Sequence, residues 1–73
     1  THLVNWDYDG IEAQRGYLPI RCGQLVRVIP ESRQAGYKYG PNKNRFDIYV
    51  FGTLVDTSGA EGDSGWVPEN CLN

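Results

Sequence analysis

The chain has 73 residues, which suits one small domain over residues 1–73 and leaves no room for a second hydrophobic core. Its net charge of −2 provides no electrostatic attraction to nucleic acid or to an anionic membrane surface. No apolar run approaches the length of a membrane span, and no signal-peptide pattern opens the chain. We therefore expect an ordinary globular domain that does not insert into membranes.

The residue inventory argues against an enzyme. The single histidine, His2, lies near the start of the chain, so a Ser-His-Asp or Cys-His site has no credible base. Zinc-binding spacings and phosphate-binding glycine motifs are absent from the sequence. Two cysteines, Cys22 and Cys71, favour thiols in a reducing compartment, hence the cytoplasm. We expect no catalytic residue, no metal site and no cofactor.

Residues 2–8 are predicted to be extended. We expect Val4 to face the core and Trp6 and Tyr8 to share the opposite face as surface anchors. The alternative is that both aromatic residues pack in the core. Asp9 and Gly10 then break the strand.

A polar hairpin arm is predicted over residues 9–17. It carries Asp9, Glu12 and Arg15, whose charges either attract a ligand or are simply solvated. After the arm, Leu18 and Ile20 have the spacing of one buried face.

The next segment turns at Cys22-Gly23-Gln24 and continues as a strand. Val26 and Val28 are predicted to face the core, whereas Leu25 and Ile29 fall on the opposite, half-covered side. Pro30 closes this strand.

Residues 30–47 are predicted to form an unusually long loop. They contain Tyr37, Tyr39 and four basic residues, which are Arg33, Lys38, Lys43 and Arg45. A loop of this length is uncommon unless it has a role or is disordered, and both alternatives stay open. Within it, residues 37–39 are expected to pair with residues 46–48 as a short strand.

Residues 48–55 form the strongest strand pattern in the chain. Val50, Gly52 and Leu54 are predicted to face the core, with tight packing at Gly52, and Tyr49 is expected to project beside Trp66. Residues 56–64 follow as a long turn. Its acidic residues match no calcium-loop spacing, which favours a solvated hairpin tip.

The segment from Gly65 to Leu72 is predicted to be strand, tight turn, strand. Trp66 and Val67 point to opposite faces of an extended chain, and Gly65 stands where a side chain would clash. Pro68 starts a turn in which Asn70 tolerates the required backbone conformation. An aromatic ring, a proline and an amide form a flat surface that suits an extended peptide ligand.

Four motifs in this order resemble a Src homology 3 (SH3) domain. The family begins with an Ala-Leu-Tyr-Asp-Tyr strand and ends with a Gly-Tyr/Trp-Ile/Val-Pro-x-Asn-Tyr strand. Residues 4–8 and 65–71 resemble these two strands, while residues 18–24 resemble the Leu-x-Phe-x-x-Gly-Asp turn and residues 49–52 the Trp-Trp-x-Gly/Ala strand. The resemblance covers nearly all of residues 3–73.

The resemblance implies an all-β fold, a small five-stranded SH3-type barrel with long RT, n-Src and distal loops. The RT loop corresponds to residues 9–17 and the n-Src loop to residues 30–47. Two positions depart from the family pattern, because Tyr17 replaces an acid and Cys71 replaces a tyrosine.

The implied function is to bind proline-rich peptides in the polyproline II conformation, which lose little entropy on docking. The two departures predict atypical specificity, within a larger signalling or scaffold protein and with the isolated domain a monomer. The residues implied to bind peptide are Trp6, Tyr8, Glu12, Tyr49, Trp66, Pro68 and Asn70. Two alternatives are a barrel that serves only as a structural or intramolecular docking module and a nucleic-acid binder, which the net charge disfavours.

Overall fold

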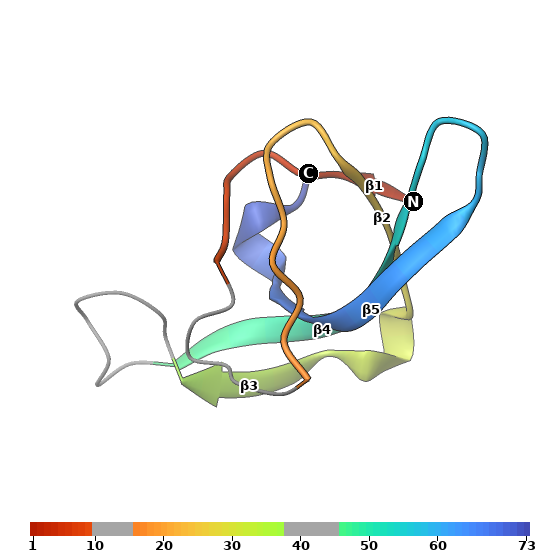
Figure 1. The fold of residues 1–73 in the computed structure, drawn as a ribbon. Coiled ribbons are helices and arrows are strands. Elements are labelled where there is room, and N and C mark those ends of the chain that lie inside the picture. Colours follow the sequence, from red (N-terminus) through yellow and green to blue (C-terminus); the bar gives the residue numbers. More distant parts are fainter. Residues whose placement is uncertain (10–15, 38–45) are drawn as a thin grey trace.

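The computed structural model describes residues 1–9, 16–37 and 46–73 (Figure 1). In these ranges the chain forms five strands and two single-turn 3-10 helices, and no described residue is α-helical. The elements are β1 (His2–Leu3), β2 (Leu25–Val28), η1 (Pro30–Ser32), β3 (Gln34–Tyr37), β4 (Phe46–Val55), β5 (Glu61–Pro68) and η2 (Glu69–Cys71). All strand pairings are antiparallel, so the predicted all-β class is confirmed.

Strand β4 is the centre of the sheet. Its first half pairs with β3 and its second half with β2 along one edge, while β5 pairs with it along the other edge. The short helix η1 lies between β2 and β3 and is tied to β4 at Phe51. The Phe51 N–H donates to Ser32 Oγ at 2.7 Å, and the Phe51 carbonyl accepts from Ile29 N–H at 3.0 Å.

Two loop predictions need correction. The expected pairing with residues 46–48 exists, but the pairing strand begins earlier, at Gln34, and Lys38 and Tyr39 lie outside the described residues. The prediction of a long distal loop over residues 56–64 is wrong, because β5 already begins at Glu61 and leaves only residues 56–60 as the turn.

The Asp56 side chain explains why this turn is tight. Its Oδ1 accepts hydrogen bonds from Ser58 N–H, Ser58 Oγ and Ala60 N–H, at 2.9, 2.6 and 2.9 Å. These bonds hold the pKa of the Asp56 carboxyl below its usual value, with the Ser58 hydroxyl as the largest cause. An aspartate side chain that accepts hydrogen bonds from the backbone of its own turn stabilises a compact turn.

The core lies where the inward faces of the strands meet. The predicted core positions are confirmed: Val4, Leu18, Ile20, Val26, Val50 and Val67 are buried, and Val28 and Leu54 pack against them. Gly52 is also buried, and a Cβ there would lie 2.4 Å from Val26 Cγ1. Glycine at this position therefore lets β2 and β4 approach closely enough to fill the core.

The two ends of the chain lie side by side (Figure 1). Val4 forms a bridge with Leu72, and the Asn73 N–H donates to the Leu3 carbonyl at 2.9 Å. Leu72, the residue after η2, thus pairs with the N-terminal segment. Strand β1 of that segment pairs in turn with β2. Cys22 is exposed, Cys71 is buried, and no disulfide joins these two described residues. Over the described ranges, no helix is long and apolar enough to cross a bilayer.

Candidate functional site

Trp6 stands out from the surface beside η2. Strand β1 ends at Leu3, and the chain bends at residue 6, which turns the indole outward with 67% of the residue exposed. The N–H groups of Asn5 and Trp6 both donate to the Cys71 carbonyl, at 2.8 and 3.4 Å. This anchoring places Trp6 next to the segment that carries the exposed Asn70.

Tyr8 does not share a surface with Trp6, so that prediction is wrong. Tyr8 is only 2% exposed and forms paired backbone hydrogen bonds with Ile20, at 2.9 and 2.8 Å. The prediction failed for two reasons. First, residues 4, 6 and 8 share one face of a regular strand, so Tyr8 belongs on the face of Val4 and not on the opposite one. Second, the bend at residue 6 turns Trp6 away from the buried Val4 and Tyr8. Tyr8 thus follows the alternative in which it packs in the core.

Tyr49 and Pro68 also differ from the prediction of an open groove. They lie opposite each other on β4 and β5, but Tyr49 is only 5% exposed and Pro68 is fully buried. Tyr17 covers Tyr49 from one side with a ring-centroid distance of 5.8 Å and an angle of 81°. Tyr8 meets the same ring edge-on at 6.5 Å, and a Cβ on Gly36 would lie 2.8 Å from Tyr49 Cδ1. Neighbouring segments therefore fill the space where the groove floor was expected.

Trp66 is half-buried and joins the residue 16–18 segment to the sheet. Its N–H donates to the Gly16 carbonyl at 2.8 Å, and its carbonyl accepts from Leu18 N–H at 3.0 Å. A Cβ on Gly65 would lie 2.9 Å from the Gly16 carbonyl oxygen, which confirms the clash expected there. The indole packs edge-on against Phe51, with ring centroids 5.4 Å apart.

A small hollow of about 170 Å³ lies beside Trp66, between the segment at Tyr17 and β3. Its lining comes from Tyr17, Gln34, Ala35, Tyr49 and Trp66. The expected neighbourhood of Tyr49 and Trp66 is thus confirmed, and both line a space large enough for one side chain. The sequence did not assign Tyr17 or Gln34 to this hollow.

Two of the described charges, on Asp9 and Arg33, form ion pairs. Asp9, expected to attract a basic ligand residue, forms an exposed ion pair with Arg21 at 2.9 Å. Glu12 and Arg15 lie outside the described residues. Arg33 donates two hydrogen bonds to the Glu69 carboxylate at 2.7 and 3.0 Å. The hydrogen bond from Arg33 holds the pKa of Glu69 below its usual value.

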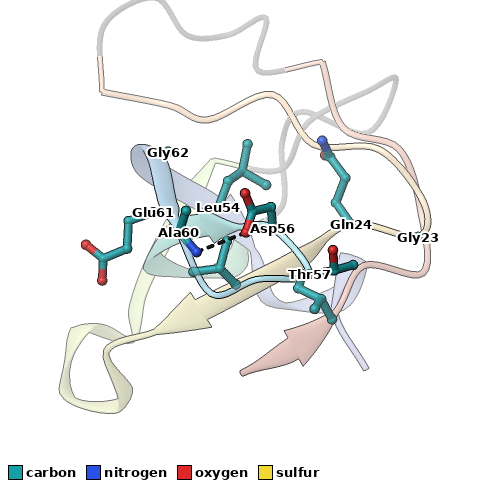
Figure 2. Close-up of a pocket in the computed structure, with 10 residues that line it drawn as sticks. Gly23, Gln24, Leu54, Asp56, Thr57, Ala60, Glu61 and Gly62 are labelled. Carbon is teal, nitrogen blue, oxygen red and sulfur yellow. Dashed lines mark hydrogen bonds between the residues drawn. The ribbon is translucent and has the colours of Figure 1, made fainter.

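A larger hollow of about 570 Å³ lies at the other end of the sheet, below the turn of residues 56–60 (Figure 2). Sequence reasoning missed it, because its walls come from three strands and two turns that meet only in the fold. It contains no residue that was predicted to bind a ligand.

Within the ranges that the structure describes, no group of three or more His, Cys, Asp or Glu side chains is arranged to hold a metal ion. The chain matches no family model, no curated protein and no solved structure.

Proposed function

We propose that this chain is an SH3-type domain that binds extended proline-rich segments of other proteins. The proposal carries with it a closed five-stranded barrel, no enzymatic activity, and a cytoplasmic parent protein of the signalling or scaffold kind. The observation that carries it is the exposed indole of Trp6, whose backbone is bonded to the segment that bears the exposed Asn70, since an amphipathic tryptophan ring is a side chain favoured at interfaces.

The surface offers the two contacts that a polyproline II helix needs. The Trp6 ring provides a flat apolar face for a proline ring, and Asn70 provides a side-chain amide for a ligand carbonyl. Tyr8, Tyr49 and Pro68 are buried, so they belong to the rigid interior rather than to the contact surface. A rigid support reduces the entropy lost on binding.

The hollow beside Trp66 is proposed to receive one ligand side chain that flanks the proline core. No carboxylate lines it, so a basic ligand residue finds no charge partner among the described lining residues. Segment 31–47 is proposed to add contacts outside the proline core, although Arg33 is already engaged by Glu69. This arrangement supports a specificity that differs from that of SH3 domains in which an acidic residue pairs with a basic residue of the ligand.

The two tryptophans of the chain are built-in reporters for a test. Adding a polyproline decapeptide should change the fluorescence of the wild-type domain in a saturable way. Trp6→Ala should weaken binding by roughly 1–3 kcal/mol, because an exposed aromatic anchor is lost. Trp6→Phe keeps an aromatic face and should retain most of the affinity. Equal affinities for wild type and Trp6→Ala would overturn the proposal.

A second candidate is a docking module that does not recognise proline. The burial of Tyr8, Tyr49 and Pro68 favours it, because three residues implied to bind peptide offer almost no surface to a ligand. A polyproline peptide would then leave the fluorescence unchanged, and a control peptide with every proline replaced by alanine would behave in the same way.

A further inference from the structure

The hollow at the tip of the β4–β5 hairpin, of about 570 Å³, is larger than the hollow of about 170 Å³ beside Trp66. It opens between the turn of residues 56–60 and the turn that precedes β2, as Figure 2 shows. Its volume of about 570 Å³ falls within the range of about 300–1,000 Å³ typical of binding pockets. Neither Trp6 nor Trp66 lines it.

The walls of this hollow are mainly aliphatic. Leu25 on β2 and Leu54 and Val55 on β4 are each only partly buried, and Ala60 in the turn is exposed. Leu25 and Val55 are direct partners across the β2–β4 pair, so their side chains share one face, and both remain partly open to water. They provide apolar surface that a partner would cover.

Hydrogen bonds within the turn hold the hairpin tip in one conformation. All three side-chain hydrogen bonds of Asp56 use Oδ1, and the backbone adds bonds from Asp56 N–H to the Ala60 carbonyl and from Gly59 N–H to the Asp56 carbonyl, both 3.0 Å. Gly59 takes the left-handed conformation, with φ of 88°, that closes the turn. The hollow therefore exists before any ligand binds.

The charge at the rim is negative. The lining includes Asp56 and Glu61 and no basic residue. Glu61 is engaged in an ion pair with Arg27, whereas Asp56 has no ion pair among the described residues. The Asp56 carboxylate is exposed at the hairpin tip, and its three side-chain hydrogen bonds to the turn use Oδ1.

We propose that this hollow is a second binding site, which takes a partner segment in which a bulky aliphatic residue adjoins a lysine or arginine. The aliphatic side chain packs on Leu25 and Val55, and the basic group meets Asp56 at the rim. Charge complementarity selects this partner over an acidic one, because the same apolar walls would place a ligand carboxylate beside Asp56.

Two matched probes test the proposal by NMR. The acetylated amide Leu-Lys-Leu should shift the backbone amides of Gly23, Leu25, Ala60 and Gly62 in a saturable way. Leu-Glu-Leu, which differs only in charge, should bind roughly two- to fivefold more weakly, as expected for an exposed ion pair. Neither peptide contains proline, so the result is independent of the surface at Trp6.

Two variants and one control complete the test. Asp56→Asn keeps an oxygen for the turn and should remove the preference for Leu-Lys-Leu. Asp63→Asn makes the same change in charge on β5 outside the lining and should preserve the preference. Ala60→Leu fills the hollow and should weaken both peptides. An equal response to both peptides, an equal loss in Asp63→Asn, or full binding to Ala60→Leu would overturn the proposal.

Discussion

Gly36 and Tyr49 lie in contact across the β3–β4 pair, with the bare backbone of the glycine against the edge of the tyrosine ring. A Cβ on Gly36 would lie 2.8 Å from Tyr49 Cδ1 and 3.1 Å from Cε1. Real Cβ atoms do not approach a ring carbon so closely. Because Gly36 has no side chain, the Tyr49 ring can lie buried against β3.

We expect Gly36→Ala to destabilise the domain by about 1–3 kcal/mol, the usual cost of overpacking. The Tyr49 ring has little room to yield, because Tyr17 and Tyr8 hold its other sides. Urea denaturation measures the loss, and near-UV circular dichroism reports the tyrosine environment. An unchanged midpoint with an altered tyrosine signal would show that the ring moves out freely.

Gly52→Ala should destabilise the domain by at least as much, about 1–3 kcal/mol or more. Its Cβ would lie 2.4 Å from Val26 Cγ1 and 3.2 Å from the Arg27 carbonyl oxygen. Gly62→Ala is the matched control on β5, because its Cβ would meet only ordinary contacts at 3.7 and 3.8 Å. Similar denaturation midpoints for the two variants would refute the close approach of β2 and β4.

Substitutions at Tyr49 and at Trp6 should separate effects on stability from effects on binding. Tyr49→Ala removes a buried ring and should cost about 3–5 kcal/mol of unfolding free energy. Trp6→Ala removes an exposed ring and should change it by less than about 0.5 kcal/mol. Thermal unfolding of both variants checks this contrast, and a strongly destabilised Trp6→Ala would contradict the exposed position of the indole.

Acid should weaken the tie between Arg33 and Glu69. The folded-state pKa of Glu69 lies below its ordinary value of 4.5, chiefly through the hydrogen bond from Arg33. The stabilisation is therefore fully present above that ordinary value and is lost as the pH falls through the lowered pKa. Glu69→Gln should flatten this part of the melting temperature profile against pH. Glu31→Gln, which removes an equal charge from η1, should leave the profile shape unchanged.

Loop replacement should depend on where it begins. Replacing residues 33–44 with a Gly-Ser linker removes β3, its pairing with β4 and the Arg33 ion pair, so we expect a clear loss of stability. From the sequence, this range was expected to be mainly loop, with a short strand only at residues 37–39. Replacing residues 38–44 keeps these features and should preserve the cooperative unfolding transition. Equal unfolding midpoints for the two replacements would show that β3 contributes little.

The sequence predicted what regular strands determine. Val26, Val50 and Val67 were placed correctly because alternation holds along continuous strands. It failed at Tyr8, which alternation would have put in the core with Val4, and at Tyr49, whose cover comes from Gly36 and Tyr17. Such cover depends on tertiary packing, which no local pattern encodes.

The charge pairs show the same limit. Arg21 pairs with Asp9, and Arg33 pairs with Glu69 although 36 positions separate them in the chain. Each of these residues looks like an independent surface charge in the sequence. The pairing with Arg21 engages Asp9, which the sequence had offered as a charge for a ligand.

The adjacency of the two chain ends determines how the fold would respond to a mechanical load. The His2 ring nitrogen Nδ1 bonds the Asn73 carbonyl at 2.8 Å, Asn73 N–H bonds Leu3, and Asn5 N–H bonds Cys71. Force applied to residues 1 and 73 therefore meets these bonds one after another, from the outermost inward, and never all together. The domain would open like a zipper at low force, and the β4–β5 pair would be loaded only after the N-terminal segment had peeled away.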